Sequence, residues 1–386
     1  MKRLSLLLLL LLCACTALPS SEEAQLFRTE EAKTLIASIA ETEMASQPTA
    51  TLPPTPTPTP VPVIDPVDYY LSYTTQERYA DWIRKLSGEE PVSIGGQEYT
   101  IDTRYSYAMF GGQENAKAYE YILETVCRWV GAEQVTLEPY TYTDSMSNYT
   151  WYNIVITFPG TVHPEEQLLF TAHFDSCVAL TDVDPLQHAP GANDNGTGMA
   201  AMLEAIPVFA QMEFERTVKV VLFSGEENFQ VGSIAYAQAH AAENIIGVIN
   251  MDMFGYDGDG DRCFEIHAGS LPGSQVIGQA LKDAAAAYFP DMSYDYFPYE
   301  LHENNIRGDH TAFWAQEIPA VTVMENFSSD SSEGGCGVGV RDETPNWHLP
   351  TDYIADITFP YAYDIAKIGT IALLNLAGAS VPTGAE

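Results

Sequence analysis

The sequence predicts an α/β domain with a largely parallel sheet that helices cover on both sides. Two observations lead to this fold class. After Tyr152, segments of strand length alternate with segments of helical periodicity, as expected where each helix returns the chain to the next parallel strand. The strand segments are also almost wholly apolar, as in 217–223, which is typical of strands with both faces buried.

Periodicity places the expected elements in chain order. Two helices open the domain, over 76–86 and 113–130, because apolar residues recur there at intervals of three and four. Downstream, short apolar runs predict strands and longer amphipathic runs predict helices. These are, in order, strands 152–158 and 167–172, helix 198–212, strand 217–223, helix 233–242, strands 245–251 and 263–267, helix 274–288, strand 321–324 and helix 357–376.

The N-terminal segment has the pattern of an export signal. We expect residues 1–14 to be a lipoprotein signal peptide, because two basic residues precede a short apolar run and LCAC at positions 12–15 fits a lipobox. The run is shorter than the roughly 20 apolar residues that a spanning helix needs. Acylation of Cys15 would anchor the protein to the bacterial cell membrane, on its extracytoplasmic side. An ordinary secretory signal cleaved nearby is the alternative.

We expect residues 15–63 to form a tether ahead of a domain over 64–386. Within the tether, residues 51–62 read TLPPTPTPTPVP. Alternating Pro and Thr favours a polyproline II conformation, which is stiff and lacks internal hydrogen bonds. At ~3.1 Å per residue this segment would be a spacer of roughly 37 Å, holding the domain away from a membrane.

Charge and cysteine content argue against several kinds of site. The formal net charge of -36 disfavours nucleic acid as a partner, because phosphate binding depends on Lys and Arg. Four of the six cysteines lie outside the signal and form no C-x-x-C pair, which argues against a thiolate zinc site. In an exported protein they could form one or two disulfides, and the sequence leaves the pairing open.

Metal-type side chains occur at five places where a strand is expected to end. Ligands collect at the carboxyl ends of the strands in sheets of this kind, so we expect these side chains to lie together. Two histidines and three carboxylates are enough to hold two divalent ions if one carboxylate is shared. The five candidate ligands are His173, Asp194, Glu227, Asp252 and His348.

Two further acids stand beside these ligands. Asp175 follows His173 by two residues and so shares its strand face, where a carboxylate can fix the tautomer of a metal-bound histidine. Glu226 directly precedes Glu227 after a very apolar strand. Two adjacent acids there are costly without a compensating charge, so we expect one to bind metal and the other to act as a base toward the attacking water.

Each segment also has an ordinary structural interpretation. The H-F-D segment at 173–175 could be a polar strand end, and the acids and amides of 193–195 could cap a helix. The glutamate pair could be a solvated loop edge, and His348 could be a structural histidine. If all five were coincidental, the chain would be a binding protein with no metal.

Taken together, six motifs resemble the di-zinc aminopeptidases of metallopeptidase family 28, which include secreted leucyl aminopeptidases and aminopeptidase Y. The motifs are, in order, H-F-D at 173–175, P-G-A-N-D-N-G-T-G at 190–198, S-G-E-E at 224–227, N-M-D-M at 250–253, G-D-H-T-A-F-W at 308–314 and H-L-P-T-D at 348–352. The likeness covers about Asn153 to the C-terminus. One departure is Gly308, where the family has a serine before Asp-His.

The resemblance implies a three-layer α/β/α sandwich around a mixed, largely parallel sheet of about eight strands. It implies two zinc ions, with Asp194 bridging them and the other four ligands completing the two sites. Glu226 would be the general base and Asp175 would orient His173. The implied activity is hydrolysis of the N-terminal residue from peptides with a free N-terminus, by a zinc peptidase domain over 64–386.

Three other functions are compatible with the same motifs. A related fold serves glutaminyl cyclases, which are transferases that use one zinc; retention of all five ligands argues against that activity. A carboxypeptidase-like relative normally inserts a lid domain before its last histidine, and 252–348 leaves no room for one. The third is a catalytically inactive binding lipoprotein, although such relatives usually lose ligands.

Overall fold

The computed structural model describes residues 64–110, 117–179, 181–299, 307–327, 333–334, 336 and 342–382, and every structural statement below refers to these residues. The predicted signal peptide, the tether and Cys15 lie outside them, as does the start of the helix expected over 113–130. Among the described residues, no helix is both long enough and apolar enough to cross a membrane.

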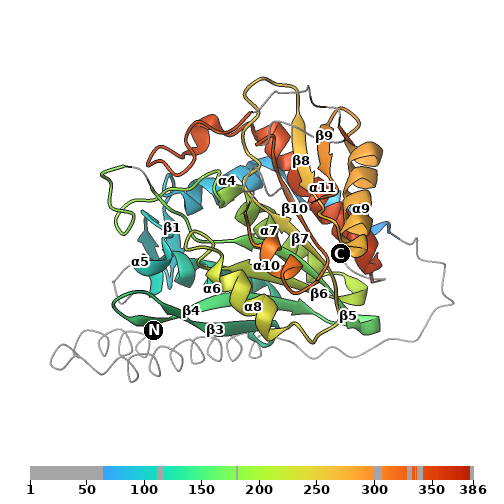
Figure 1. Cartoon of the computed structure of the whole chain (residues 1–386), viewed down its shortest axis with the longest axis horizontal. Coiled ribbons are helices and arrows are strands. Elements are labelled where there is room, and N and C mark those ends of the chain that lie inside the picture. The colour runs from blue at the N-terminus through green and yellow to red at the C-terminus, as the bar shows by residue number, and fades with distance from the viewer. Residues whose placement is uncertain are drawn as a thin grey trace, which may run out of the picture. The chain divides into compact units, whose positions relative to one another are not determined.

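A ten-stranded mixed sheet forms the middle of the domain (Figure 1). Its order is β11-β9-β8-β10-β7-β5-β6-β4-β3, and β12 pairs with β6. The neighbours β6, β5, β7 and β10 are parallel, whereas β4 and β8 run antiparallel to them on either side. The strands are β3 (Val135–Thr143), β4 (Asn148–Phe158), β5 (Gly160–His173), β6 (Glu213–Phe223), β7 (Ile245–Met251), β8 (Cys263–His267), β9 (Ser293–Phe297), β10 (Ala320–Glu325), β11 (Glu333–Gly334) and β12 (Ala379–Ser380).

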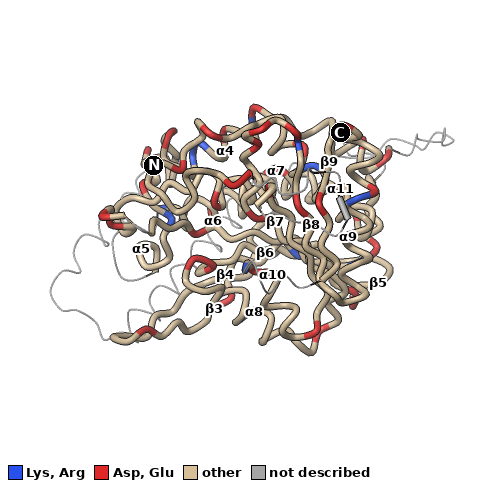
Figure 2. Tube along the Cα trace, turned by 45° about the horizontal axis from the view of Figure 1, so that its top comes forward, with Lys and Arg blue, Asp and Glu red and all other residues tan. Residues whose placement is uncertain are grey.

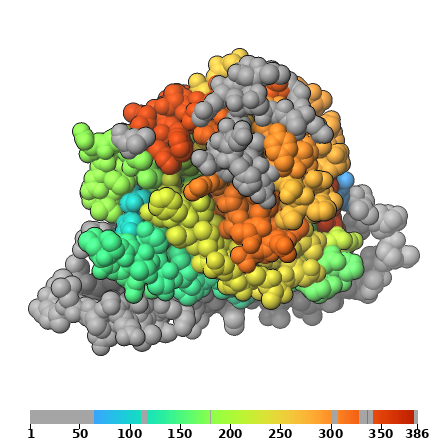
Figure 3. Space-filling model, viewed as in Figure 1, coloured from blue at the N-terminus to red at the C-terminus, as the bar shows by residue number. Residues whose placement is uncertain are grey.

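Helices cover both faces of this sheet, which confirms the predicted three-layer α/β fold. One face carries α4, α6, α7, α9 and α11, and the other carries α8 and α10, which lie side by side in Figure 3. The helices are α3 (Pro66–Tyr73), α4 (Gln76–Leu86), α5 (Ser106–Phe110), α6 (Lys117–Val130), α7 (Gly196–Phe209), α8 (Val231–Ala239), α9 (Pro272–Tyr288), α10 (His310–Trp314) and α11 (Phe359–Ala377). A separate hairpin joins β1 (Val92–Ile94) to β2 (Gln97–Tyr99).

The apolar strands are buried on both faces because successive side chains point to opposite layers. Leu169 packs with Tyr236 of α8 and Phe313 of α10. The next residue, Phe170, faces the other layer, where Gly369 of α11 lets the helix approach the sheet closely. Each such buried apolar side chain contributes about 1.5–3 kcal/mol.

The sequence-based predictions match most of these elements. The predicted bounds of α4, β7 and β8 agree with the structure, and the other predicted strands and helices differ mainly at their ends. Nine α-helices and β-strands among the described residues were not predicted: α3, α5, α10, β1, β2, β3, β9, β11 and β12. Polar residues and tyrosines interrupt β3 and β9, so neither strand shows a continuous apolar run, and α5 and α10 are five residues long, too short to show helical periodicity.

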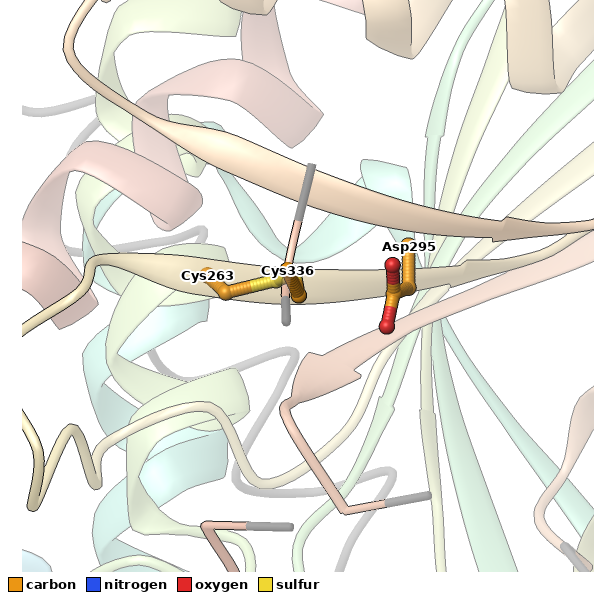
Figure 4. Close-up of side chains that lie close together, drawn as sticks. All are labelled: Cys263, Asp295 and Cys336. Atoms are coloured by element: carbon orange, nitrogen blue, oxygen red, sulfur yellow. A yellow bond between two sulfur atoms is a disulfide. The ribbon is translucent and has the colours of Figure 1, made fainter. Parts of the chain in front are cut away.

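Cys263 at the start of β8 and Cys336 form a disulfide, which resolves the pairing that the sequence left open. The other two described cysteines, Cys127 and Cys177, take part in no disulfide within the described residues. Figure 4 shows the bond with the Asp295 carboxylate of the neighbouring strand β9 beside it. Because the two sulfur atoms are joined to each other, we interpret this group as a covalent link and not as a metal site.

Candidate active site

The predicted ligands meet at the carboxyl edge of the parallel strands. His173 is the last residue of β5, Asp252 directly follows β7, and Glu227 lies four residues beyond the end of β6. Asp194 precedes α7 and His348 lies in the segment before α11, so the prediction that every ligand lies at a strand end is wrong for these two, which long loops bring to the same edge. The topology therefore gathers five side chains that are up to 175 positions apart in sequence, as the rule for open α/β sheets leads one to expect.

The first ligand set is centred on the His173 imidazole. Its Nε2 lies 3.3 Å from Oδ1 of Asp194 and 3.2 Å from Oδ1 of Asp252. All three residues are buried. One ligand atom from each lies within 4.8 Å of the others, so a single ion could contact all three.

The second set uses the other oxygen of the same aspartate. Nε2 of His348 lies 3.3 Å from Oδ2 of Asp194 and 2.9 Å from Oε2 of Glu227. Asp194 therefore belongs to both sets, with one oxygen facing each. The Asp194 carboxylate is available to both sets because of the local structure at the start of α7. The side chain that caps α7 is the neighbouring Asn195, whose Oδ1 accepts the Gly198 N–H at 2.8 Å, so the Asp194 carboxylate is not used as a helix cap.

The chemistry of the two sets fits zinc. Imidazole nitrogens and carboxylate oxygens are the donors zinc prefers beside thiolates, and three protein ligands leave a position open, as in catalytic zinc sites. Oε1 of Glu227 is buried without a hydrogen-bond partner among the described residues. An unpaired buried carboxylate oxygen is costly, and a cation would satisfy it.

The pKa shifts of the candidate ligands also indicate a site for cations. Burial, then the charge of Asp194, raises the pKa of Glu227 to about 7. Burial by itself lowers the pKa of His348, but the carboxylates of Glu227 and Asp194 outweigh this and raise it to about 11. The site therefore favours positive charge where the two sets meet, which two divalent ions would supply.

The side chains of Glu226 and Glu227 point to different partners, which agrees with the different roles expected for them. Glu227 turns toward His348, whereas Oε1 of Glu226 accepts a hydrogen bond from Nε2 of Gln230 at 2.7 Å. Burial raises the pKa of Glu226 well above its ordinary value, and the nearby acids reinforce the shift. A carboxyl group with a raised pKa beside a metal site is suited to proton transfer near neutral pH.

Asp175 lies behind the first ligand set. Its Oδ1 is 3.6 Å from Nδ1 of His173, whereas its own backbone oxygen is closer to that nitrogen, at 3.2 Å. The two oxygens of its carboxylate accept hydrogen bonds from the Glu226 N–H at 3.2 Å and from the Ser106 hydroxyl at 3.0 Å. Asp175 thus connects the backbone of Glu226 to the segment that carries His173.

Three residues that hold the ligands in place were not predicted from the sequence. Arg104 is fully buried and donates hydrogen bonds to the carbonyls of Phe174 and Gly191, one from each ligand-bearing loop. Trp347 donates its indole N–H to Oδ2 of Asp194 at 2.9 Å. The third, Ser106, is the hydroxyl donor to Asp175, and none of the three has a local sequence signal.

Asp352, the last residue of the H-L-P-T-D motif, holds the backbone around the shared ligand. Its two carboxylate oxygens accept the N–H groups of Asn193 at 2.9 Å and Asp194 at 3.1 Å. Burial raises the pKa of Asp352 to about 7, although both hydrogen bonds lower it. The motif could have indicated this role, because it places an acid close to His348 in sequence.

The Gly308 departure lies directly against the site. A Cβ atom at this position would lie 3.0 Å from Oδ2 of Asp252, so the glycine allows a close approach to a candidate ligand. The next residues, Asp309 and His310, are buried. Burial raises the pKa of Asp309 to about 7 and lowers that of His310 to about 3, so this histidine is neutral.

Comparison with known proteins agrees with the motifs. Residues 153–369 match the family model described as Peptidase family M28. The chain belongs to this family. Arg104 and helices α3 to α6 lie ahead of the matched region.

The M28 chain is similar to curated proteins over part of their length. A probable zinc metalloprotease of Leptosphaeria maculans is 28% identical over 258 residues, which are 59% of this chain and 57% of that protein. A probable aminopeptidase of Saccharomyces cerevisiae is 26% identical over 165 residues, or 41% of this chain and 42% of the yeast protein. The chain thus spans about half the length of these relatives.

Solved structures show the same fold at low sequence identity. The LapA aminopeptidase of Legionella pneumophila superposes with a TM-score of 0.57 at 15% identity, covering 81% of this chain and 74% of LapA. A glutaminyl cyclase of Fimbriiglobus ruber has a TM-score of 0.57 at 17% identity, covering 78% of this chain and 95% of the cyclase. At these identities the comparison supports the fold alone.

Proposed function

We propose that this protein is an aminopeptidase that hydrolyses the N-terminal residue of peptides with two zinc ions. The observation that carries the proposal is that two three-residue ligand sets share Asp194, with Glu226 close enough to interact electrostatically with His173, Asp252 and Glu227. The family supports zinc peptidase chemistry. Two ions on one bridging carboxylate are suited to displacement at a carbonyl group.

The residues can be assigned to steps of hydrolysis. When bound, zinc would act as a Lewis acid on the scissile carbonyl and lower the pKa of the attacking water. Glu226 takes the proton of that water and delivers it to the leaving amine. Gln230 holds Oε1 of Glu226, which leaves Oε2 for the proton. Asp175 fixes the backbone N–H of Glu226 and the Nδ1 side of His173.

The charge around the ligand sets supports a substrate with a free N-terminus. Two zinc ions in the sets would offset most of the negative charge of Asp194, Glu226, Glu227 and Asp252, so the attraction for an ammonium group comes from the acids outside this group. The wider surface is acidic, because Asp and Glu are spread over the described chain and far outnumber Lys and Arg (Figure 2). A cationic N-terminus would therefore be steered toward this protein.

A single-zinc glutaminyl cyclase is the second candidate, because the fold matches cyclases as well as it matches aminopeptidases. The cyclase of Porphyromonas gingivalis is covered over 99% of its length, at a TM-score of 0.56. Both activities can act on N-terminal residues, so the fold does not separate them. The number of bound zinc ions and the reaction product distinguish the two activities.

The test combines metal content with product analysis. We expect the purified full-length protein to contain about two zinc ions per chain and to release N-terminal residues from aminoacyl-anilides until a chelator is added. Glu226→Gln should lower kcat about 100- to 10,000-fold and keep both ions. Near-normal turnover of this variant would show that Glu226 is not the base. One bound zinc ion per chain, with cyclised N-terminal glutamine as the product, would establish the cyclase. No bound metal and no turnover would indicate a binding protein.

We also propose that Cys15 is lipidated and that residues 15–63 tether an extracytoplasmic domain over 64–386. The support is the lipobox-like LCAC at positions 12–15, followed by the Pro/Thr-rich segment. Cys15→Ser should move the protein from the membrane fraction to the soluble fraction. Unchanged fractionation of this variant, with no lipid adduct in the mass spectrum of the mature N-terminus, would contradict the proposal.

A further inference from the structure

Trp347 directly precedes a candidate ligand and contacts the shared one. Its indole Nε1 donates a hydrogen bond to Oδ2 of Asp194 at 2.9 Å. The same oxygen lies 3.3 Å from Nε2 of His348, whereas Oδ1 faces His173 at 3.3 Å. An indole N–H can donate but cannot accept, so the Asp194 oxygen is the acceptor in this bond. Apart from the two histidines, no other described side chain is hydrogen-bonded to this carboxylate.

The indole ring is itself held in place from several directions. It stacks on the His348 ring with 4.2 Å between centroids and an interplanar angle of 28°. Phe327 packs against it edge-on at 5.8 Å. The backbone of the segment is fixed by the Leu349 N–H to the Asn346 carbonyl at 3.0 Å and by the Ala179 N–H to the His348 carbonyl at 3.0 Å. The donor therefore approaches Asp194 from a fixed direction.

The rotation of the Asp194 carboxylate decides which oxygen each ligand set receives. The Asp352 carboxylate fixes the backbone N–H of Asp194, but this bond does not constrain the side chain. The terminal torsion of an aspartate is broad. The Trp347 hydrogen bond supplies the missing constraint, because it holds Oδ2 on the side of His348 and so leaves Oδ1 on the side of His173.

We propose that Trp347 is a positioning residue of the metal centre, and that its indole N–H holds the bridging carboxylate so that each oxygen serves one ligand set. The inference rests on the proposed function, because it takes Asp194 to bridge two ions. Partners that orient metal ligands in this way typically contribute about 10- to 100-fold to metal affinity. The ion held by Glu227, His348 and Oδ2 should be the one affected most.

Trp347→Phe tests the proposal, because phenylalanine keeps an aromatic ring and removes the N–H. Trp82→Phe is a matched control: the Trp82 indole donates to Oε1 of Glu204, also at 2.9 Å, away from the candidate ligands. Zinc affinity is measured on full-length wild type and both variants by competition with a chelator. We expect one of two zinc affinities to fall about 10- to 100-fold in Trp347→Phe and neither to fall in Trp82→Phe.

Equal zinc affinities in wild type and Trp347→Phe would overturn the inference, however many ions the wild type binds. Fewer than two ions on the wild type would overturn the proposed two-zinc function instead. A second measurement is made on the wild-type protein, so its result does not depend on how tightly the variant binds zinc. The protein is labelled with ¹⁵N-tryptophan, and the NMR resonance of the Trp347 indole N–H is identified because it is absent from the spectrum of Trp347→Phe. In the wild-type protein this resonance should shift when zinc is added. Lack of a shift would also overturn the inference.

Discussion

Replacing Arg104 by Lys should destabilise the protein and weaken metal binding together. The guanidinium donates four hydrogen bonds to buried carbonyls: Nε to Phe174 at 2.9 Å, Nη1 to Leu86 at 2.7 Å and to Pro190 at 2.6 Å, and Nη2 to Gly191 at 2.8 Å. Phe174 follows the ligand of β5, and Pro190 and Gly191 precede the shared aspartate. Arg104 thus sets the distance between two ligand-bearing loops.

The magnitude follows from the donors that remain. Lysine keeps the charge but carries its donors on a single nitrogen, which cannot span carbonyls arranged around a planar fork. We expect at least two of the four hydrogen bonds to be lost. A hydrogen bond to a charged group contributes about 1.5–3 kcal/mol, so Arg104→Lys should lower the free energy of unfolding by about 3–6 kcal/mol.

The assay is urea unfolding of the zinc-free protein, followed by titration of the folded variant with zinc. Arg262→Lys is the control, because Arg262 makes partly exposed ion pairs with Asp364 at 2.6 Å and Asp291 at 3.2 Å. Such pairs contribute up to about 1 kcal/mol. The reasoning would be refuted if Arg104→Lys unfolded within about 1 kcal/mol of wild type and bound zinc as tightly.

Two further predictions concern stability away from the ligands. Glu204→Ala removes a buried carboxylate that accepts hydrogen bonds from the partly exposed Arg78, at 2.6 Å, and from the Trp82 indole, at 2.9 Å. It should lower the free energy of unfolding in urea by about 1–3 kcal/mol, because these hydrogen bonds are lost while the Arg78 charge remains solvated. Unchanged zinc affinity is expected, and a cost below about 0.5 kcal/mol would contradict the prediction. Hydrogen bonding to Glu138 and Glu243 outweighs burial and raises the pKa of His240. Its stabilisation should therefore be complete below the unfolded pKa of about 6.5 and be lost as pH rises through the higher folded value. His240→Gln should lower the melting temperature of the zinc-free protein more at pH about 6 than at pH about 9, and an equal loss at both would refute the assignment.

The difference between predicted and missed elements has a physical cause. The bounds of β7 are visible in the sequence because the strand is a continuous apolar run. In much of β3 partly buried and exposed residues alternate, but Thr, Tyr and Pro fill many of its positions, so the two faces do not differ clearly in polarity. Its strand character depends on pairing with β4 along its whole length.

The candidate ligands were predictable because each belongs to a short local motif, and two of them also lie at the end of a strand. His173 ends β5, and Asp252 follows β7 directly, so a local pattern marks both. The residues that hold the ligands have no such marker. Trp347 lies 153 positions from Asp194, and Arg104 lies 87 positions from Gly191. Nothing in the neighbouring sequence indicates these contacts.

By itself, the sequence determined the alternation of strands and helices, the identity of the five candidate ligands and the resemblance to the family. These properties depend on residues close together in the chain, where periodicity and motif spacing are visible. Only the tertiary structure decided that the two oxygens of Asp194 face different ligand sets, and that Arg104 and Trp347 hold those sets in place. Such contacts arise from the topology of the sheet, which brings together residues that the chain keeps far apart.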